Sequence, residues 1–105
     1  MKLKIVISHA AGKDLDIIAD YITERAGRQI AHRVIDAIER TFNLLAEYPG
    51  IGTAQDYGPE FDGLRMFPVS RYPNYLIFFQ AIDRSLIIRR VLHGAMDIEA
   101  IFTLG

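Results

Sequence analysis

The hydrophobic residues of this chain change from helical spacing to strand spacing in the middle of the sequence, and that change limits the possible folds more than any other feature. Between residues 9 and 47 they recur every three or four positions, as they do on one face of an α-helix. Between residues 64 and 93 they form short runs rich in β-branched and aromatic residues, which is typical of β-strands. Helices followed by strands in a short chain predict an α+β fold, with the helices packed on one side of the sheet.

The helical part divides at Gly27 into two helices. Ser8 can cap the first helix with its hydroxyl group, and Gly27 can end it because glycine enters the left-handed region at little cost. The second helix follows with almost no loop and ends at Tyr48-Pro49-Gly50. Two helices joined so tightly predict an antiparallel hairpin. Its buried stripe is expected to contain Ala11, Leu15, Ile18, Ala19, Ile22, Ala31, Val34, Ile35, Ile38, Phe42 and Leu45.

Charged residues occupy much of the remaining surface of the first helix. We expect the acidic ones to be solvated, and they are Asp14, Asp16, Asp20 and Glu24.

Four strands are expected around this hairpin. Residues 2–7 predict a short N-terminal strand. A loop rich in Gly, Pro and Asp follows the helices at 49–63, and a meander of three antiparallel strands is then predicted at 64–70, 75–82 and 86–93. The expected order is β-α-α-β-β-β, with the hairpin on one face of a small antiparallel sheet and a short helical turn at the C-terminus.

The predicted strands are apolar on both faces, which is unusual for a sheet with one free face. Within the strand at 75–82 we expect Leu76 and Phe78 to point away from Ile77 and Phe79. Within the strand at 86–93 we expect Leu86 and Ile88 to point away from Ile87 and Val91. Pro68 cannot donate a hydrogen bond to a ladder, so it indicates an edge or a bulge. An apolar sheet face often marks a partner site. Part of this face is expected to be covered by the last apolar residues, Ile98, Ile101, Phe102 and Leu104.

Length and charge limit the class of protein. The 105 residues fit a single domain, 1–105, with one hydrophobic core. The net charge is −1, whereas a general nucleic-acid binder is usually basic. Residues 64–93 nevertheless carry five arginines and one aspartate, a net charge of +4. This segment is either a solvated sheet face or a site for an anionic surface.

Several kinds of chemistry have no residues to support them. The chain has no cysteine, which excludes a thiolate metal site and is compatible with the cytoplasm. No apolar run is long enough for a membrane span. His9, His32 and His93 are scattered without a carboxylate cluster, so no metal site is expected. Phosphate-binding loops and nucleophile motifs are absent as well, and no cofactor is expected.

The chain resembles the ParE family of type II toxin–antitoxin systems over nearly its whole length. The likeness lies in the order of five segments, which are Ala10/Ala11-x-x-Asp14-Leu15-x-x-Ile18-x-x-Tyr21, Tyr48-Pro49-Gly50-Ile51-Gly52, Gly63-Leu64-Arg65, Tyr75-Leu76-Ile77-Phe78-Phe79 and Arg90-Val91-Leu92-His93-Gly94-Ala95-Met96-Asp97. The last of these is the most specific, although the family often has Arg where Met96 stands. The resemblance implies the α+β fold already predicted from the spacing.

The resemblance also implies a function based on protein contacts. A ParE-like protein is a toxin that a ParD-like antitoxin neutralises by folding onto it, and characterised members act on DNA gyrase. Direct binding of nucleic acid by the toxin alone is not expected. Partner contacts should come from exposed apolar and aromatic side chains and from the arginines of the sheet. The candidates for antitoxin binding are Ile17, Tyr21, Ile30, Leu44, Phe78, Arg65 and Arg90.

The related RelE branch gives an alternative function, which is ribosome-dependent cleavage of mRNA. Such an enzyme needs groups that activate the 2′-hydroxyl, stabilise phosphate charge and protonate the leaving oxygen. The candidates are Arg65, Arg90 and His93, but residues 94–105 hold no Tyr, Lys, Arg or His, and no lysine follows Lys13. His93 and Arg65 each have a structural alternative, which is a bond to Asp97 that fixes the turn or the sheet.

Overall fold

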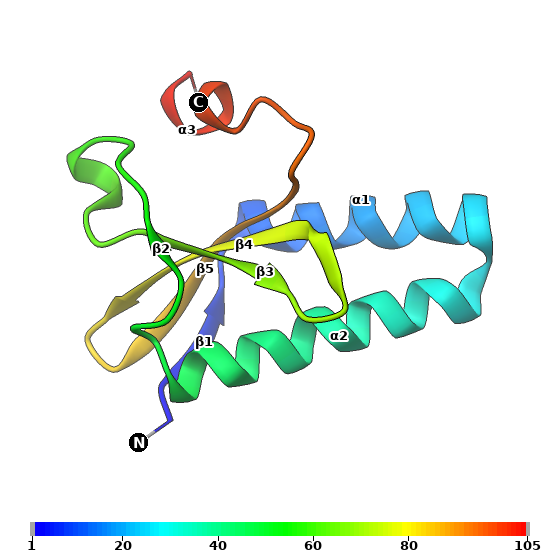
Figure 1. Ribbon diagram of the computed structural model, residues 1–105, viewed down its shortest axis with the longest axis horizontal. Helices are drawn as coiled ribbons and strands as arrows, with labels where there is room; N and C mark the ends of the chain where they lie inside the picture. The colour runs from blue at the N-terminus through cyan, green and yellow to red at the C-terminus, as the bar shows by residue number, and fades with distance from the viewer. Residues whose placement is uncertain (1, 105) are drawn as a thin grey trace.

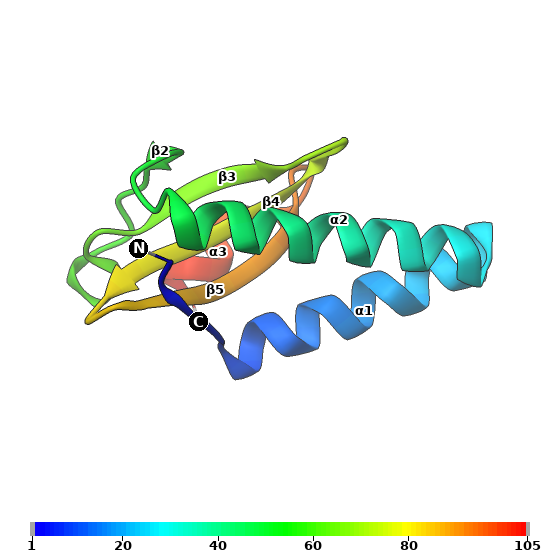
Figure 2. The ribbon, with the colours of Figure 1, turned by 90° about the horizontal axis from the view of Figure 1, so that it is seen from below.

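The computed structural model describes residues 2–104. Its elements are β1 (Lys4–Ile7), α1 (His9–Ala26), α2 (Arg28–Glu47), β2 (Thr53–Ala54), a 3₁₀ turn at Pro59–Phe61, β3 (Arg65–Val69), β4 (Tyr72–Ile82), β5 (Ser85–His93) and α3 (Ile98–Thr103). The α+β class and the predicted order of elements are confirmed. The antiparallel hairpin of α1 and α2 covers one face of the sheet, and α3 lies against the other face (Figures 1 and 2).

The sheet differs from the prediction at both edges. Its strand order is β1-β5-β4-β3-β2. Strand β1 runs parallel to β5, with Ile5 beside Leu86 and Ile7 beside Ile88, so the expectation of a wholly antiparallel sheet is wrong. A parallel pair needs a long connection, and the helix hairpin and the meander between these strands supply it. At the opposite edge the predicted loop contains β2, which pairs with β3.

The predicted helix ends are confirmed in atomic detail. The hydroxyl oxygen of Ser8 accepts a hydrogen bond of 3.1 Å from the backbone N–H of Ala11, which is the first-turn bond expected of a cap. Gly27 has φ of 95° and donates its N–H to the carbonyl oxygen of Thr23. These two residues therefore set the length of α1, and α2 can begin at the very next position.

The hairpin and the sheet enclose the main hydrophobic core. Its largest buried side chains include Ile38, Phe42 and Leu45 from α2, and Ile77 and Phe79 from β4. Burial of aliphatic and aromatic area at about 25 cal/mol per Å² is the main term that favours such a layered fold. The predicted stripe of the hairpin is confirmed in its central members, whereas Leu15, Ala19 and Ile35 are only partly buried.

A β-bulge in β5 reverses the expected direction of some side chains. Phe78 pairs with Arg90 and Phe79 pairs with Ile88, so Arg89 is an extra residue in the ladder. Beyond this point the alternation shifts by one. Val91 therefore packs in the main core with Ile88, and the prediction that these two residues face opposite sides is wrong. Pro68 is expected at an edge or a bulge, and the pairing of β3 with β4 does shift register between Pro68 and Val69.

A second, smaller core lies on the other face of the sheet, under α3. Its buried members are Leu64, Phe78, Leu92 and Phe102. The ring of Phe102 lies within 4.9–5.1 Å of the rings of Tyr57, Phe61 and Phe78, measured between centroids. The tail of the chain thus covers part of the sheet face, as predicted. Leu104 is an exception, because it is 86% exposed and takes no part in the cover.

Candidate partner-binding site

An ion pair joins α1 to β5 at the centre of the candidate site. Nε and Nη2 of Arg90 each donate a hydrogen bond of 2.8 Å to the carboxylate of Asp14. The same carboxylate accepts a bond of 2.9 Å from the backbone N–H of Val91. Asp14 is buried, so the expectation that it is a solvated surface residue is wrong. Strand β1 ends at Ile7 and does not reach Val91 of β5. The carboxylate of Asp14 therefore accepts the hydrogen bond that a neighbouring strand would otherwise accept from Val91.

The ion pair also changes the electrostatics of the arginine. The hydrogen bond to Asp14 raises the pKa of Arg90 above its ordinary value; partial burial acts in the opposite direction, and the negative charge of Asp14 adds to the increase. Arg90 therefore stays a cation at any physiological pH. Its guanidinium group is held by two parallel bonds, which fix its plane as well as its position.

An apolar groove lies on one side of this ion pair, and we name it the α1 groove. Its volume is about 430 Å³, and its exposed large hydrophobic members are Ile17, Tyr21 and Met96, which are 66%, 53% and 49% exposed. The full lining is Asp14, Ile17, Ile18, Tyr21, Tyr75, Arg90, Val91, Leu92, His93 and Met96. Large apolar side chains that remain this exposed next to one another are typical of a surface that another protein covers.

Two tyrosines and a histidine give the α1 groove a polar rim. Burial raises the pKa of Tyr75 above the ordinary value of a tyrosine, and the nearby Tyr21 phenol adds to this effect. The ring of His93 meets the ring of Tyr75 edge to face, with centroids 5.4 Å apart. Aromatic side chains with a polar tip are frequent at protein interfaces, because one end can be buried while the other keeps a hydrogen bond.

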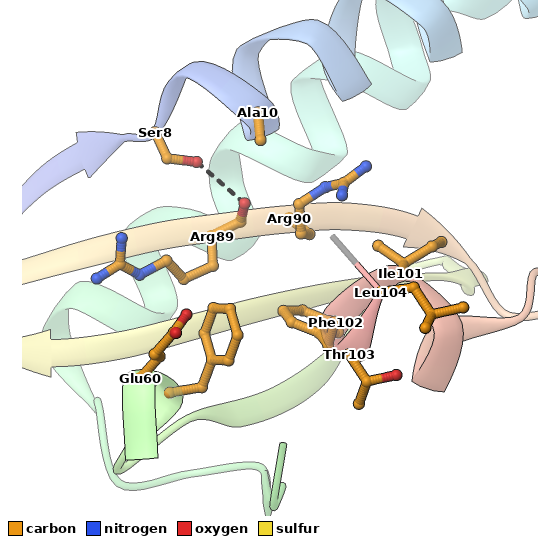
Figure 3. Close-up of a pocket in the computed structure, with 10 residues that line it drawn as sticks. Ser8, Ala10, Glu60, Arg89, Arg90, Ile101, Phe102, Thr103 and Leu104 are labelled. Carbon is orange, nitrogen blue, oxygen red and sulfur yellow. Dashed lines mark hydrogen bonds between the residues drawn. The ribbon is translucent and has the colours of Figure 1, made fainter. Parts of the chain in front are cut away.

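A second groove lies on the other side of Arg90, beside α3, and we name it the α3 groove. It has a volume of about 510 Å³ and is lined by Ser8, Ala10, Glu60, Phe61, Arg89, Arg90, Ile101, Phe102, Thr103 and Leu104. Figure 3 shows the guanidinium groups of Arg89 and Arg90 pointing away from each other along β5. Arg89 and Arg90 both belong to the bulge. The extra residue in the ladder therefore allows both arginines to line the α3 groove.

Buried polar groups hold the backbone and side chain of Arg89. Ser8 donates its hydroxyl proton to the carbonyl oxygen of Arg89 over 3.0 Å, as Figure 3 shows. The Nε of Arg89 donates to Oε1 of Gln80, which is buried in β4. The amide nitrogen of Gln80 in turn donates to the backbone oxygen of Asp62 over 2.8 Å. Arg89 is therefore positioned by a short chain of hydrogen bonds rather than by solvent.

Comparison with known proteins identifies the family. The family model described as the ParE toxin of the type II toxin–antitoxin system parDE matches residues 5–98. The chain belongs to the ParE toxin family. It is thus a toxin component of a type II toxin–antitoxin system, as the resemblance of its five segments implied.

Two known proteins are similar to this ParE-family toxin over most of its length. The protein named Toxin ParE3 from Caulobacter vibrioides is 25% identical over 97 residues, which are 92% of each chain. A solved structure of a chromosomal ParDE system from P. aeruginosa superposes with a TM-score of 0.73, at 20% identity, over 88% of this chain and 96% of the other. The second likeness supports the fold.

The predicted antitoxin contacts of this ParE-family toxin fall into separate places. Ile17 and Tyr21 lie together in the α1 groove. Leu44 is exposed on α2 and Ile30 is half-buried against the main core, and both lie outside the two grooves. Phe78 is 1% exposed beneath Phe102, so a partner can reach it only if α3 moves.

The three candidates for RNA cleavage do not converge on one site. Arg65 pairs with Phe79 and Arg90 pairs with Phe78, and successive residues of a strand point to opposite faces. The two arginines are thus on opposite faces, with β4 between them. Arg65 donates from Nη1 to the carbonyl oxygen of Gly52 over 3.0 Å, which is a structural contact different from the alternative pair with Asp97.

His93 has a structural contact of its own, different from the one expected. Its Nδ1 accepts a hydrogen bond of 3.0 Å from the backbone N–H of Ala95. Asp97 instead caps α3 by accepting from the N–H of Ala100 over 3.2 Å. The expected bond from His93 to Asp97 is therefore wrong, because the carboxylate is engaged by the helix that follows it.

Two further properties of the described residues bear on function. Between residues 2 and 104 the side chains form no group of three His, Asp or Glu that could hold a metal ion. The helices over the same range include none that is long and apolar enough to cross a membrane.

Among the groove members that sequence reasoning misses are Asp14, Tyr75, Arg89 and Met96. Asp14 looks like part of a solvated face because its partner lies 76 positions away in the sequence. Arg89 stands out only as part of a cationic segment. The sequence does hold one signal, which is the pair Arg89-Arg90 within an otherwise apolar strand. One of two adjacent cations in such a strand needs a bulge or a buried acid to accommodate it, so the pair indicates one of these features.

Proposed function

We propose that this ParE-family toxin acts by protein–protein contact, that a ParD-like antitoxin neutralises it by covering the α1 groove, and that DNA gyrase is its target. The observation that carries the antitoxin part is the exposure of Ile17, Tyr21 and Met96 in one apolar groove beside a fixed arginine. Family membership and the similarity to a P. aeruginosa ParDE system support a partner of the ParD kind. The gyrase target rests on family membership alone.

The composition of the groove suits a helix or extended segment of a partner. Interfaces draw most of their affinity from a few side chains, often Trp, Tyr or Arg, and the contacts around them exclude water. Tyr21 and Arg90 are of these types, and the apolar side chain of Ile17 lies with them in the groove. An antitoxin segment that buries them removes apolar area from water and leaves the helix hairpin otherwise unchanged.

Growth experiments test the toxin and the antitoxin together. Expression of the protein alone in a bacterium should arrest growth and produce filaments, since a gyrase poison blocks replication. Co-expression of the adjacent short reading frame should restore growth. Normal growth at a confirmed level of folded protein would count against toxicity, and arrest that the adjacent frame fails to relieve would count against the antitoxin. We propose the cytoplasm as the location of the toxin.

A biochemical experiment tests the target. The purified toxin should reduce supercoiling by DNA gyrase or increase cleaved DNA, and it should leave the positions of translating ribosomes on mRNA unchanged in a toeprinting assay. Unaltered gyrase activity together with new ribosome-dependent cuts would overturn the gyrase proposal in favour of the RNase alternative. The purified toxin should also fail to bind duplex DNA in the absence of gyrase.

A further inference from the structure

The α1 groove and the α3 groove meet at Arg90, which lines both of them. On one side of Arg90 lie the apolar side chains of Ile17 and Met96. On the other side lie those of Ile101 and Leu104, the latter two shown beside Phe102 in Figure 3. The surface therefore presents two apolar hollows with a cation between them, along the end of β5.

The two arginines at this junction keep unused hydrogen-bond donors. Arg90 gives Nε and one Nη2 proton to Asp14, and no acceptor for its Nη1 is found within residues 2–104. Arg89 gives Nε to Gln80, and over the same residues both of its terminal nitrogens lack an acceptor. Each guanidinium group is thus held in place by a buried acceptor while its outer donors face a groove. A ligand that accepts from these donors meets side chains whose orientation is already fixed.

The charges around the junction select one kind of anion. Arg89 and Arg90 supply two positive charges, while Asp14 and Glu60 supply two negative ones nearby. The net charge of these four groups is zero, so the junction lacks the excess of positive charge that the repeated phosphates of a nucleic acid need for binding. A single carboxylate needs only the outer donors of one guanidinium group, which match it in geometry.

We infer that the partner crosses Arg90 with a segment in which one acidic residue lies between two apolar residues. The carboxylate accepts from the free donors of Arg89 or Arg90, and the apolar side chains fill the α1 groove and the α3 groove. This inference rests on the proposed antitoxin and names the chemistry of the segment that it places on the toxin. It also assigns the α3 groove, which has no role in the proposed function.

A titration with two short peptides tests the inference on the purified toxin alone. The first peptide has capped ends and the sequence Leu-Ser-Glu-Ser-Leu. The second has Gln in place of Glu. The Nε–H resonances of Arg89 and Arg90 are followed by nuclear magnetic resonance. The Glu peptide should shift at least one of the two resonances, and the Gln peptide should bind about tenfold more weakly, because a charged hydrogen bond is replaced by a neutral one.

Three substitutions sharpen the test, and each lies outside the Asp14–Arg90 pair. Arg89→Gln should weaken the Glu peptide about fivefold, and Glu60→Gln should strengthen it about twofold, since one removes an attracting charge and the other a repelling charge. Arg84→Gln, in the exposed turn before β5, is the matched control and should have no effect. Unchanged amide spectra of the variants establish that the fold is intact.

Each remaining outcome counts against the inference. Equal binding of the Glu and Gln peptides, no binding of either at millimolar concentration, or tighter binding of a short DNA duplex than of the Glu peptide would overturn it. The readout needs neither growth arrest nor gyrase. A toxin that binds the Glu peptide but fails the growth and gyrase experiments would contradict the proposed function alone. A toxin that passes those experiments but does not bind the peptide would contradict this inference alone.

Discussion

Asp14 and Arg90 form a bidentate ion pair across 76 positions of sequence, with both N–O distances at 2.8 Å. Because Asp14 is buried and also accepts from Val91, its removal leaves a guanidinium group and a backbone N–H without their acceptor. Asp14→Ala should lower the free energy of unfolding by about 3 kcal/mol, the usual effect of breaking such a pair. Urea denaturation followed by circular dichroism measures it.

The neighbouring exposed acid supplies the control for this prediction. Asp16→Ala, on the solvent side of α1, should change the stability by less than about 0.5 kcal/mol. Equal stabilities of the Asp14 and Asp16 variants would contradict the role assigned to the ion pair.

The α1 groove gives a prediction about binding without unfolding. Ile17 and Tyr21 are 66% and 53% exposed, so replacing both with Ala removes little core packing. The double variant should bind the antitoxin from the adjacent reading frame at least about 100-fold more weakly, because each side chain is a type that dominates interfaces. Isothermal titration calorimetry measures the affinity. Tyr48→Ala, which removes an exposed tyrosine outside both grooves, should leave it unchanged.

Local features of the fold were predictable from the sequence, because local residues cause them. Ser8 and Gly27 set the ends of α1 through bonds to residues three or four positions away. Pro68 marks a register shift because it cannot donate to a ladder. Periodicity likewise gave the helix hairpin, and the exposed positions of Ile17 and Tyr21 followed from their place outside the buried stripe.

The features that could not be predicted depend on distant parts of the chain. Strand β1 pairs in parallel with β5, a partner that its own residues do not specify. The burial of Asp14 depends on where Arg90 arrives. Arg89 is extruded by a bulge, which moves Val91 to the core face, and a simple alternation of side chains cannot anticipate that shift. These parts of the candidate site thus arise from tertiary pairing.

Gly52 allows a close approach between β2 and β3. Its φ is 98°, and a Cβ at this position would lie 2.6 Å from the carbonyl oxygen of Met66. Gly52→Ala combines backbone strain with this clash and should cost about 3 kcal/mol or more in the free energy of unfolding. Gly58 is a matched control, with φ of 97° and open space around it, so Gly58→Ala should cost only about 1–2 kcal/mol. Thermal melts of both variants test the difference, and equal losses would show that the contact with Met66 is unimportant.

The cover over the second core depends on one ring. Phe102 contacts Tyr57, Phe61 and Phe78, and α3 has only six residues with which to hold itself in place. Phe102→Ala should lower the stability by about 3 kcal/mol and expose the sheet face beneath, which would raise the fluorescence of a hydrophobic dye. Leu104→Ala changes an exposed residue of the same tail and should change neither the stability nor the dye fluorescence. Unaltered dye binding by the Phe102 variant would show that α3 stays in place without its ring.

Tyr75 gives the stability a dependence on alkaline pH. Burial, with a smaller effect of the nearby Tyr21, raises its pKa in the folded protein, so the folded state holds the phenol proton more tightly than the unfolded chain does. The contribution of this group is fully present below about pH 10 and is lost as the pH rises through the raised pKa. Tyr75→Phe has no proton to release and should lose less stability between pH 7 and pH 11 than the natural protein. Urea denaturation at several pH values measures the loss, and Tyr48→Phe should lose as much as the natural protein because Tyr48 is exposed. Equal losses of stability by Tyr75→Phe and Tyr48→Phe over this range would show that the raised pKa of Tyr75 does not cause the alkaline loss of stability.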